Sequence, residues 1–159
     1  MHGNTMPHED YSNLLQIDDL MYTQIMINEH IEIVQQFAAA LDTEDYAAAK
    51  SVLSPTCVYI FREQTYKGPE AIMATYSGNG EAAKAFDEIR YGSYVRDGED
   101  GWIVIEFWDE LVHRGETLRH VCEQWAKVSD GVILQIEHRD LEGERERLEA
   151  FKNRCFGEE

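Results

Sequence analysis

The sequence predicts a single α+β domain in which helices cover one face of an antiparallel sheet. Apolar residues recur at helical spacing early in the chain, and after Phe86 the pattern changes to the period-two alternation of strands. Helices followed by a run of strands are typical of α+β proteins. With 159 residues, of which 43% are hydrophobic, the chain can bury a core without metal or disulfide links.

Two helices are predicted before the first strand. The first spans residues 11–41, in one piece or two. Its later part carries an apolar stripe: Ile27, Ile31, Val34, Ala38 and Leu41. A second helix follows, because Asp42 or Thr43 can cap it and the alanines at 47–49 have high helix propensity. Pro55 ends this helix.

The remaining elements are five strands and two short helices. "TCVYIFRE" (56–63) is rich in β-branched and aromatic residues and predicts the first strand. Pro69 opens a short helix, which "GNGEAAKA" (78–85) extends or follows. Four strands are then expected at 86–95, 101–112, 117–128 and 132–139, separated by turn sequences at 96–101, 113–116 and 129–131. The tail at 141–155 predicts a short, charged helix.

The charge excludes several classes of partner. The chain has 31 acidic and 14 basic residues and a net charge of -17, which repels phosphate backbones and anionic lipids. We therefore expect no nucleic-acid or membrane partner. The first residues lack the features of a signal peptide and no apolar run is long enough to span a bilayer, so we expect a cytoplasmic protein. Cys57, Cys122 and Cys155 lie far apart, which indicates free thiols rather than disulfides or a zinc site.

Three segments, taken in this order, carry a resemblance to a known superfamily: "FAAALDTEDYAAAKSVLSPTCVYI" (37–60), "YKGPEAIMATY" (66–76) and "DGVILQIEHRD" (130–140). They resemble the nuclear transport factor 2-like superfamily, in its polyketide-cyclase-like and ketosteroid-isomerase-like branch. The resemblance implies a curved sheet wrapped around helices to form a cone with an interior pocket, and an outer sheet face that pairs two subunits. Members isomerise, dehydrate, cyclise, hydrolyse epoxides or only bind partners, so the fold does not settle the function. Residues 1–28 exceed the shared core and are predicted to be a helical extension of a cone-shaped domain at 29–159.

Turn geometry predicts which strand residues share a face. A two-residue turn at Arg114-Gly115 would place Asp109 opposite His120. A three-residue loop at Ser129-Asp130-Gly131 would place Cys122 opposite His138. One face then carries a mostly apolar set: Ile105, Phe107, Asp109, Leu111, Leu118, His120, Cys122, Gln124, Leu134, Ile136 and His138. The other carries charges and tryptophans: Glu106, Trp108, Glu110, Arg119, Glu123, Trp125, Gln135, Glu137 and Arg139.

Asp109, His120 and His138 are the candidate catalytic residues. An aspartate beside an imidazole can orient it and raise its basicity, and a second histidine can act as acid or hydrogen-bond donor. The resemblance implies that in polyketide-cyclase-like members a catalytic aspartate fills the interior position that His138 holds in this chain. The competing interpretation is that Asp109 and His120 only satisfy each other's hydrogen bonds.

A further set is expected to line the pocket and contact a ligand: Tyr59, Tyr76, Tyr91, Phe107, Cys122, Gln124 and Ile136. Each also has a plain structural interpretation, with the tyrosines packing in the core, Cys122 acting as a small apolar residue and Gln124 as a satisfied amide. The loop at 96–101 leaves open whether Arg90, Tyr91 or Tyr94 faces the pocket. His113, at a hairpin end, is expected to be exposed, and the histidines lack the spacing of a metal site.

Two functions are compatible with these observations. The first is a cofactor-independent isomerase, dehydratase or cyclase, in which proton transfer acts on an apolar or ring-bearing molecule. The second is a non-enzymatic homodimer that binds a ligand or a protein and depends on its outer tryptophans. The sequence leaves open whether the chain is an enzyme and what its substrate is.

Overall fold

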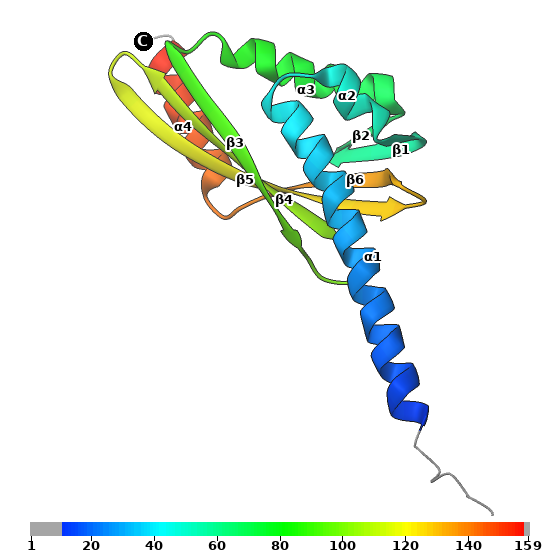
Figure 1. The fold of residues 1–159 in the computed structure, drawn as a ribbon. Coiled ribbons are helices and arrows are strands. Elements are labelled where there is room, and N and C mark those ends of the chain that lie inside the picture. The colour runs from blue at the N-terminus through cyan, green and yellow to red at the C-terminus, as the bar shows by residue number, and fades with distance from the viewer. Residues whose placement is uncertain (1–10, 158–159) are drawn as a thin grey trace, which may run out of the picture.

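The computed structural model describes residues 11–157 (Figure 1). Helix α1 (Tyr11–Asp42) is a single unbroken helix. Its first part projects beyond the sheet in Figure 1, and all residues from 18 to 25 are exposed. Its last turns are buried, with Val34 and Phe37 fully inaccessible. Residues 1–10 of the predicted extension lie outside the described residues, and the division at residue 28 stays a prediction.

The second helix, α2 (Tyr46–Ser51), begins later than the sequence suggests. Its cap is Asp45, whose Oδ1 accepts a hydrogen bond from the Ala48 amide at 3.1 Å, so the prediction of Asp42 or Thr43 is wrong. The Thr43 hydroxyl instead donates to carbonyls in the last turn of α1, and the Asp42 carboxylate accepts from Ser93. Both candidates therefore have other partners.

The sheet has six strands in the order β2-β1-β6-β5-β4-β3. They are β1 (Leu53–Phe61), β2 (Gln64–Lys67), β3 (Glu88–Asp97), β4 (Ile103–His113), β5 (Glu116–Ser129) and β6 (Val132–Asp140). The sequence analysis missed β2, a short strand at the sheet edge. It also predicted an antiparallel sheet, whereas β1 and β6 pair in parallel and the sheet is mixed. These two strands lie far apart in the chain, so no local turn indicates their relative direction.

The two hairpins show how far turn chemistry predicts register. Arg114 and Gly115 both have positive φ, and the predicted β4–β5 register is confirmed, including Asp109 opposite His120. The predicted β5–β6 register is wrong. Asp130 and Gly131 alone form the turn, which pairs Ser129 with Val132. A bulge next to Lys127 takes up the extra residue, so Leu134 leaves the inner face and is 40% exposed.

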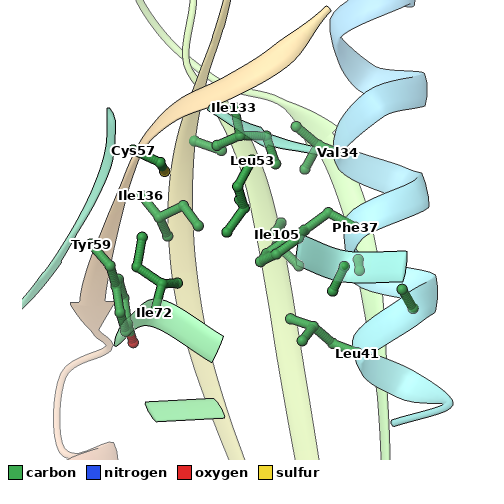
Figure 2. Close-up of a cluster of buried hydrophobic side chains, with 14 of the residues drawn as sticks. Val34, Phe37, Leu41, Leu53, Cys57, Tyr59, Ile72, Ile105, Ile133 and Ile136 are labelled. Atoms are coloured by element: carbon green, nitrogen blue, oxygen red, sulfur yellow. The ribbon is translucent and has the colours of Figure 1, made fainter. Parts of the chain in front are cut away.

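The core lies where α1, α3 (Pro69–Ala83) and the inner sheet face meet. Figure 2 shows side chains from these elements pointing toward one another: Val34, Phe37, Leu41, Leu53, Cys57, Tyr59, Ile72, Ile105, Ile133 and Ile136. A second cluster lies under α4 (Glu144–Phe156) and contains Phe86, Leu111, Leu118, Phe151 and Cys155. The curved sheet and the helices thus form the α+β cone that the sequence predicts. No helix within residues 11–157 combines the length and apolarity that a bilayer crossing requires.

Candidate functional site

A cavity of about 470 Å³ lies between the two apolar clusters, lined by Leu41 and Tyr59 of the first and by Phe86 and Leu111 of the second. Nine of the ten predicted site residues line it: Tyr59, Tyr76, Tyr91, Phe107, Asp109, His120, Cys122, Gln124 and His138. Ile136 does not line it, because it pairs with Ala126 and is fully buried in the first cluster. The volume is in the range of small-molecule sites.

His138 lines this cavity and has a polar contact at each ring nitrogen. Its Nε2 lies 2.9 Å from Asp140 Oδ1, and its side chain is 7% exposed. Its Nδ1 lies 3.5 Å from Gln124 Nε2, an amide nitrogen that can only donate. This pair of contacts assigns the proton to Nε2 and leaves Nδ1 as the acceptor. Burial lowers the pKa of His138, against the opposing effect of Asp140, so the imidazole is neutral near neutral pH.

Asp140 is in turn held by Arg62, at the tight connection between β1 and β2. Arg62 Nε donates to Oδ2 at 2.9 Å and Nη2 donates to Oδ1 at 3.1 Å. These hydrogen bonds, followed by the one from His138, hold the pKa of Asp140 well below its usual range. The sequence analysis missed both residues. The spacing of His138 and Asp140, two apart on one strand, could have revealed the aspartate, whereas no sequence signal connects Arg62 to it.

Asp109 and His120 stand opposite each other, as predicted, but without a hydrogen bond. Their closest approach, from His120 Nδ1 to Asp109 Oδ2, is 3.8 Å. The His120 side chain is 10% exposed and the Asp109 side chain 42%. The expected hydrogen bond from His120 to Asp109 is therefore not formed.

Gln124 organises the aromatic side of the cavity. Tyr76 Oη donates to its Oε1 at 2.5 Å, and its Nε2 donates to Tyr59 Oη at 3.0 Å. The rings of Tyr59 and Tyr76 are stacked, with centroids 5.3 Å apart. Burial raises the pKa of both phenols, so both stay protonated. Gln124 thus has partners for both ends of its amide and holds two tyrosines in place.

The opposite side of the cavity is acidic. Tyr91 pairs with Asp109 and so faces inward, which settles the open register of β3 and puts Arg90 and Tyr94 on the other face. Tyr91 Oη donates to Glu44 Oε1 at 3.2 Å, and Ser93 Oγ donates to Asp42 Oδ2 at 2.6 Å. Burial raises the pKa of Asp42, and the charge of Asp109 raises it further. The sequence analysis missed Asp42 and Glu44 as cavity residues, since both lie at a helix junction with no strand pattern.

Two further side chains contribute less to chemistry. Burial raises the pKa of the Cys122 thiol to about 12, so it is an apolar wall residue rather than a nucleophile. His113 was predicted to be exposed and is instead buried, packed between Phe86 and Phe156. The prediction failed because α4 folds back over the end of the β4–β5 hairpin. Within residues 11–157, no three His, Cys, Asp or Glu side chains are arranged to hold a metal ion.

Comparison with known proteins identifies the fold. No family model and no curated protein matches the sequence. Among solved structures, the chain is similar to TerC co-crystallised with polyporic acid, with 16% identity, a TM-score of 0.59, and coverage of 79% of this chain and 96% of that one. It is similar to an LEH-like epoxide hydrolase of M. tuberculosis, with 15% identity, a TM-score of 0.56, and coverage of 79% and 94%.

A third similar structure is an NTF2-like protein of unknown function from Burkholderia pseudomallei, with 14% identity, a TM-score of 0.58, and coverage of 76% and 96%. At these identities the likeness concerns the fold and not the activity. The chain has the fold of the nuclear transport factor 2-like superfamily.

Proposed function

We propose that this protein is a cofactor-independent enzyme that binds an apolar, ring-bearing molecule in its cavity and acts on it by proton transfer, as an isomerase, dehydratase or cyclase. The observation that supports this most is the contact between His138 and Asp140, 2.9 Å apart at the wall of a cavity of about 470 Å³. An imidazole held by a carboxylate in a sheltered pocket is a common arrangement for a general base.

In this proposal the substrate takes the place of the long, 3.5 Å contact from Gln124, and His138 accepts the proton at Nδ1. Because burial lowers its pKa, the imidazole is unprotonated and ready near neutral pH. When it takes a proton from the substrate, the negative charge of Asp140 stabilises the imidazolium, and Arg62 keeps Asp140 ionised. In the same proposal His120, which is buried and lines the cavity, exchanges a second proton with the substrate. The roles of His120 and His138 are thus part of the proposal, whereas the orientation of His120 by Asp109, expected from the sequence, is not.

The walls favour a flat, apolar ligand. Tyr59, Phe61, Tyr76 and Phe107 line the cavity and offer ring faces and edges to another ring system. Two of the similar structures are named for small-molecule chemistry, one with polyporic acid and one as an epoxide hydrolase. Those names apply to those proteins and support small-molecule binding here only by analogy.

Exchange of carbon-bound hydrogen in deuterated water tests the proposal without knowledge of the natural substrate. The protein is incubated with 2-tetralone and 1-indanone, and NMR follows deuterium entering next to the carbonyl. Exchange should exceed the buffer rate, and His138→Gln should lower it by roughly 10²-fold or more. Glu137→Gln, a neighbour on the opposite face of β6, is the matched control and should change nothing. Equal rates with and without the protein would count against the proposal, as would full activity in His138→Gln.

The second candidate is a non-enzymatic homodimer that binds through the outer sheet face. The observation that favours it is a layer of tryptophans and cations on that face. The Arg139 guanidinium lies 3.8 Å from the Trp125 ring centroid, Arg119 lies 4.7 Å from Trp108, and Lys127 lies 4.5 Å from Trp102. Aromatic and arginine side chains are enriched at protein interfaces.

A cytoplasmic location also remains a prediction from the sequence.

A further inference from the structure

We propose that the ligand of this cavity carries a positively charged amine, which binds between the carboxylates of Asp42 and Asp109. This inference rests on the proposed function only in taking the cavity as a ligand site. It adds the chemical class of the ligand, an organic cation joined to an apolar ring.

The residues concerned share one side of the cavity. His120 on β5, Asp109 on β4 and Tyr91 on β3 occupy paired positions and form a row across three adjacent strands. Asp42 reaches the same side from the end of α1, where Ser93 of β3 donates to it at 2.6 Å. All of these side chains except Ser93 line the cavity.

The carboxylates of Asp42 and Asp109 lack a matching cation in the part of the chain that the structure describes. Among residues 18–157, Asp42 forms no ion pair, and Asp109 has only the 3.8 Å approach of His120. Of the basic residues that line the cavity, Arg62 pairs with Asp140, Lys84 with Glu81 and Arg145 with Glu149. Lys152, on α4, pairs with neither Asp42 nor Asp109. Two like charges facing each other in a partly buried site are unfavourable, and a ligand cation between them removes that repulsion.

His120 is an independent indication that a ligand belongs here. Its side chain is nine-tenths buried, it lines the cavity, and no hydrogen bond to it is formed by any residue that the structure describes. Buried polar groups normally have a partner, so an imidazole without one leaves a hydrogen-bonding position for a bound molecule. That position lies beside Asp109, between the acidic side and His138.

The wider surroundings favour a cation over an anion. The net charge of -17 produces a field that attracts positive molecules and repels negative ones. Tyr46 and Tyr91 line the same end of the cavity, and aromatic ring faces attract ammonium groups. His138 pairs with Gln124, four residues along β5 from the position opposite Asp109. Two strand spacings and four residues of strand separate the Cα atoms of Asp109 and His138 by roughly 16 Å, and both side chains extend into the cavity, so the ligand has its amine at one end and its ring toward the other.

Binding of three matched probes, measured by isothermal titration calorimetry, tests the inference. They are 2-(1-naphthyl)ethylamine, the neutral 2-(1-naphthyl)ethanol and the anionic 1-naphthylacetate. We expect the amine to bind about tenfold to a hundredfold more tightly than the alcohol, and the acetate to bind most weakly. Asp109→Asn and Asp42→Asn should each remove most of this preference. Glu106→Gln, a carboxylate on the other face of β4, is the matched control and should keep it.

The outcomes separate this inference from the proposed function. Equal binding of amine and alcohol, or tighter binding of the acetate, overturns the inference and leaves the cavity as a ligand site. A preference that survives in both Asn variants, with folding verified by circular dichroism, also overturns it. Absence of binding by all three probes counts against the inference and against the cavity as a ligand site together.

Discussion

His138 and Asp140 lie two residues apart on β6, with Nε2 of the imidazole 2.9 Å from Oδ1 of the carboxylate. Residues at this spacing point to the same face of a strand, so the pair is built by local geometry alone. Arg62 fixes the carboxylate from the far side with two hydrogen bonds. The result is a chain of three polar side chains that ends on a buried imidazole facing the cavity.

Asp140→Asn should destabilise the fold by about 1–3 kcal/mol near pH 7, because it removes the charge that Arg62 and His138 contact. The pKa of Asp140 is held below the ordinary value of about 4, so this stabilisation is fully present above about pH 4 and is lost as the pH falls further. Urea unfolding of Asp140→Asn and of the original chain, from about pH 7 to pH 3, measures the stability difference between them. A stability difference that does not shrink with acidity would contradict the assignment.

The stability of Asp42→Asn relative to the original chain should depend on pH in the opposite direction from that of Asp140→Asn. Burial raises the pKa of Asp42, so its contribution to stability is full below about pH 4 and declines as the pH rises through the raised value. Asn retains an oxygen that accepts from Ser93, and we expect the variant to gain stability relative to the original chain as the pH rises, by at most about 1 kcal/mol. Urea midpoints at several pH values test this, with Glu99→Gln in an exposed loop as control. If the stability difference between Asp42→Asn and the original chain did not change with pH, the raised pKa of Asp42 would be contradicted.

Gly92→Ala should destabilise the sheet by roughly 1–3 kcal/mol. A Cβ at this position would lie 2.6 Å from the indole of Trp108, its partner on β4, and the ring would have to move. Tryptophan fluorescence should change along with the unfolding midpoint. Gly78→Ala is the matched control, because nothing lies within 4 Å of the added carbon and alanine favours the helix, so that variant should be slightly more stable. Equal effects of the two changes would show that the contact with Trp108 is unimportant.

Trp125→Ala should convert a dimer to monomers if the outer sheet face pairs two copies, as the second candidate function requires. The change removes the ring under Arg139 and leaves the cavity residues untouched. Sedimentation velocity measures the mass in solution. Leu20→Ala, at an exposed position of α1, serves as the comparison. If Leu20→Ala dissociates the dimer and Trp125→Ala does not, the interface lies on α1 and not on the outer sheet face.

Removal of residues 1–27 should leave a folded domain whose melting temperature changes by only a few degrees. The α1 residues that enter the core, Val34 and Phe37 among them, all lie after this point, and residues 18–25 are exposed. Circular dichroism gives both the helix content and the melting temperature. Loss of cooperative unfolding would contradict the predicted division into an extension and a domain.

The local chemistry of the chain determined much of the site. Arg114-Gly115 specifies a two-residue turn, and such a turn sets the register of the whole β4–β5 hairpin, so Asp109 and His120 could be placed opposite each other from the sequence. Alternation along β6 likewise put His138 on the inner face. At the next hairpin the same reasoning failed, because a bulge near Lys127 shifts the register and cannot be distinguished in sequence from a longer turn.

The partners of these residues were decided only by the tertiary structure. Arg62 contacts Asp140 across 78 residues of chain, and Ser93 contacts Asp42 across 51. Such contacts depend on the parallel pairing of β1 with β6 and on where α1 ends above the curved sheet, neither of which any local pattern encodes. The sequence by itself determined which side chains face inward, since that follows from strand period and turn type. Which of them meet a charge, a hydrogen bond or open space followed from packing between distant elements.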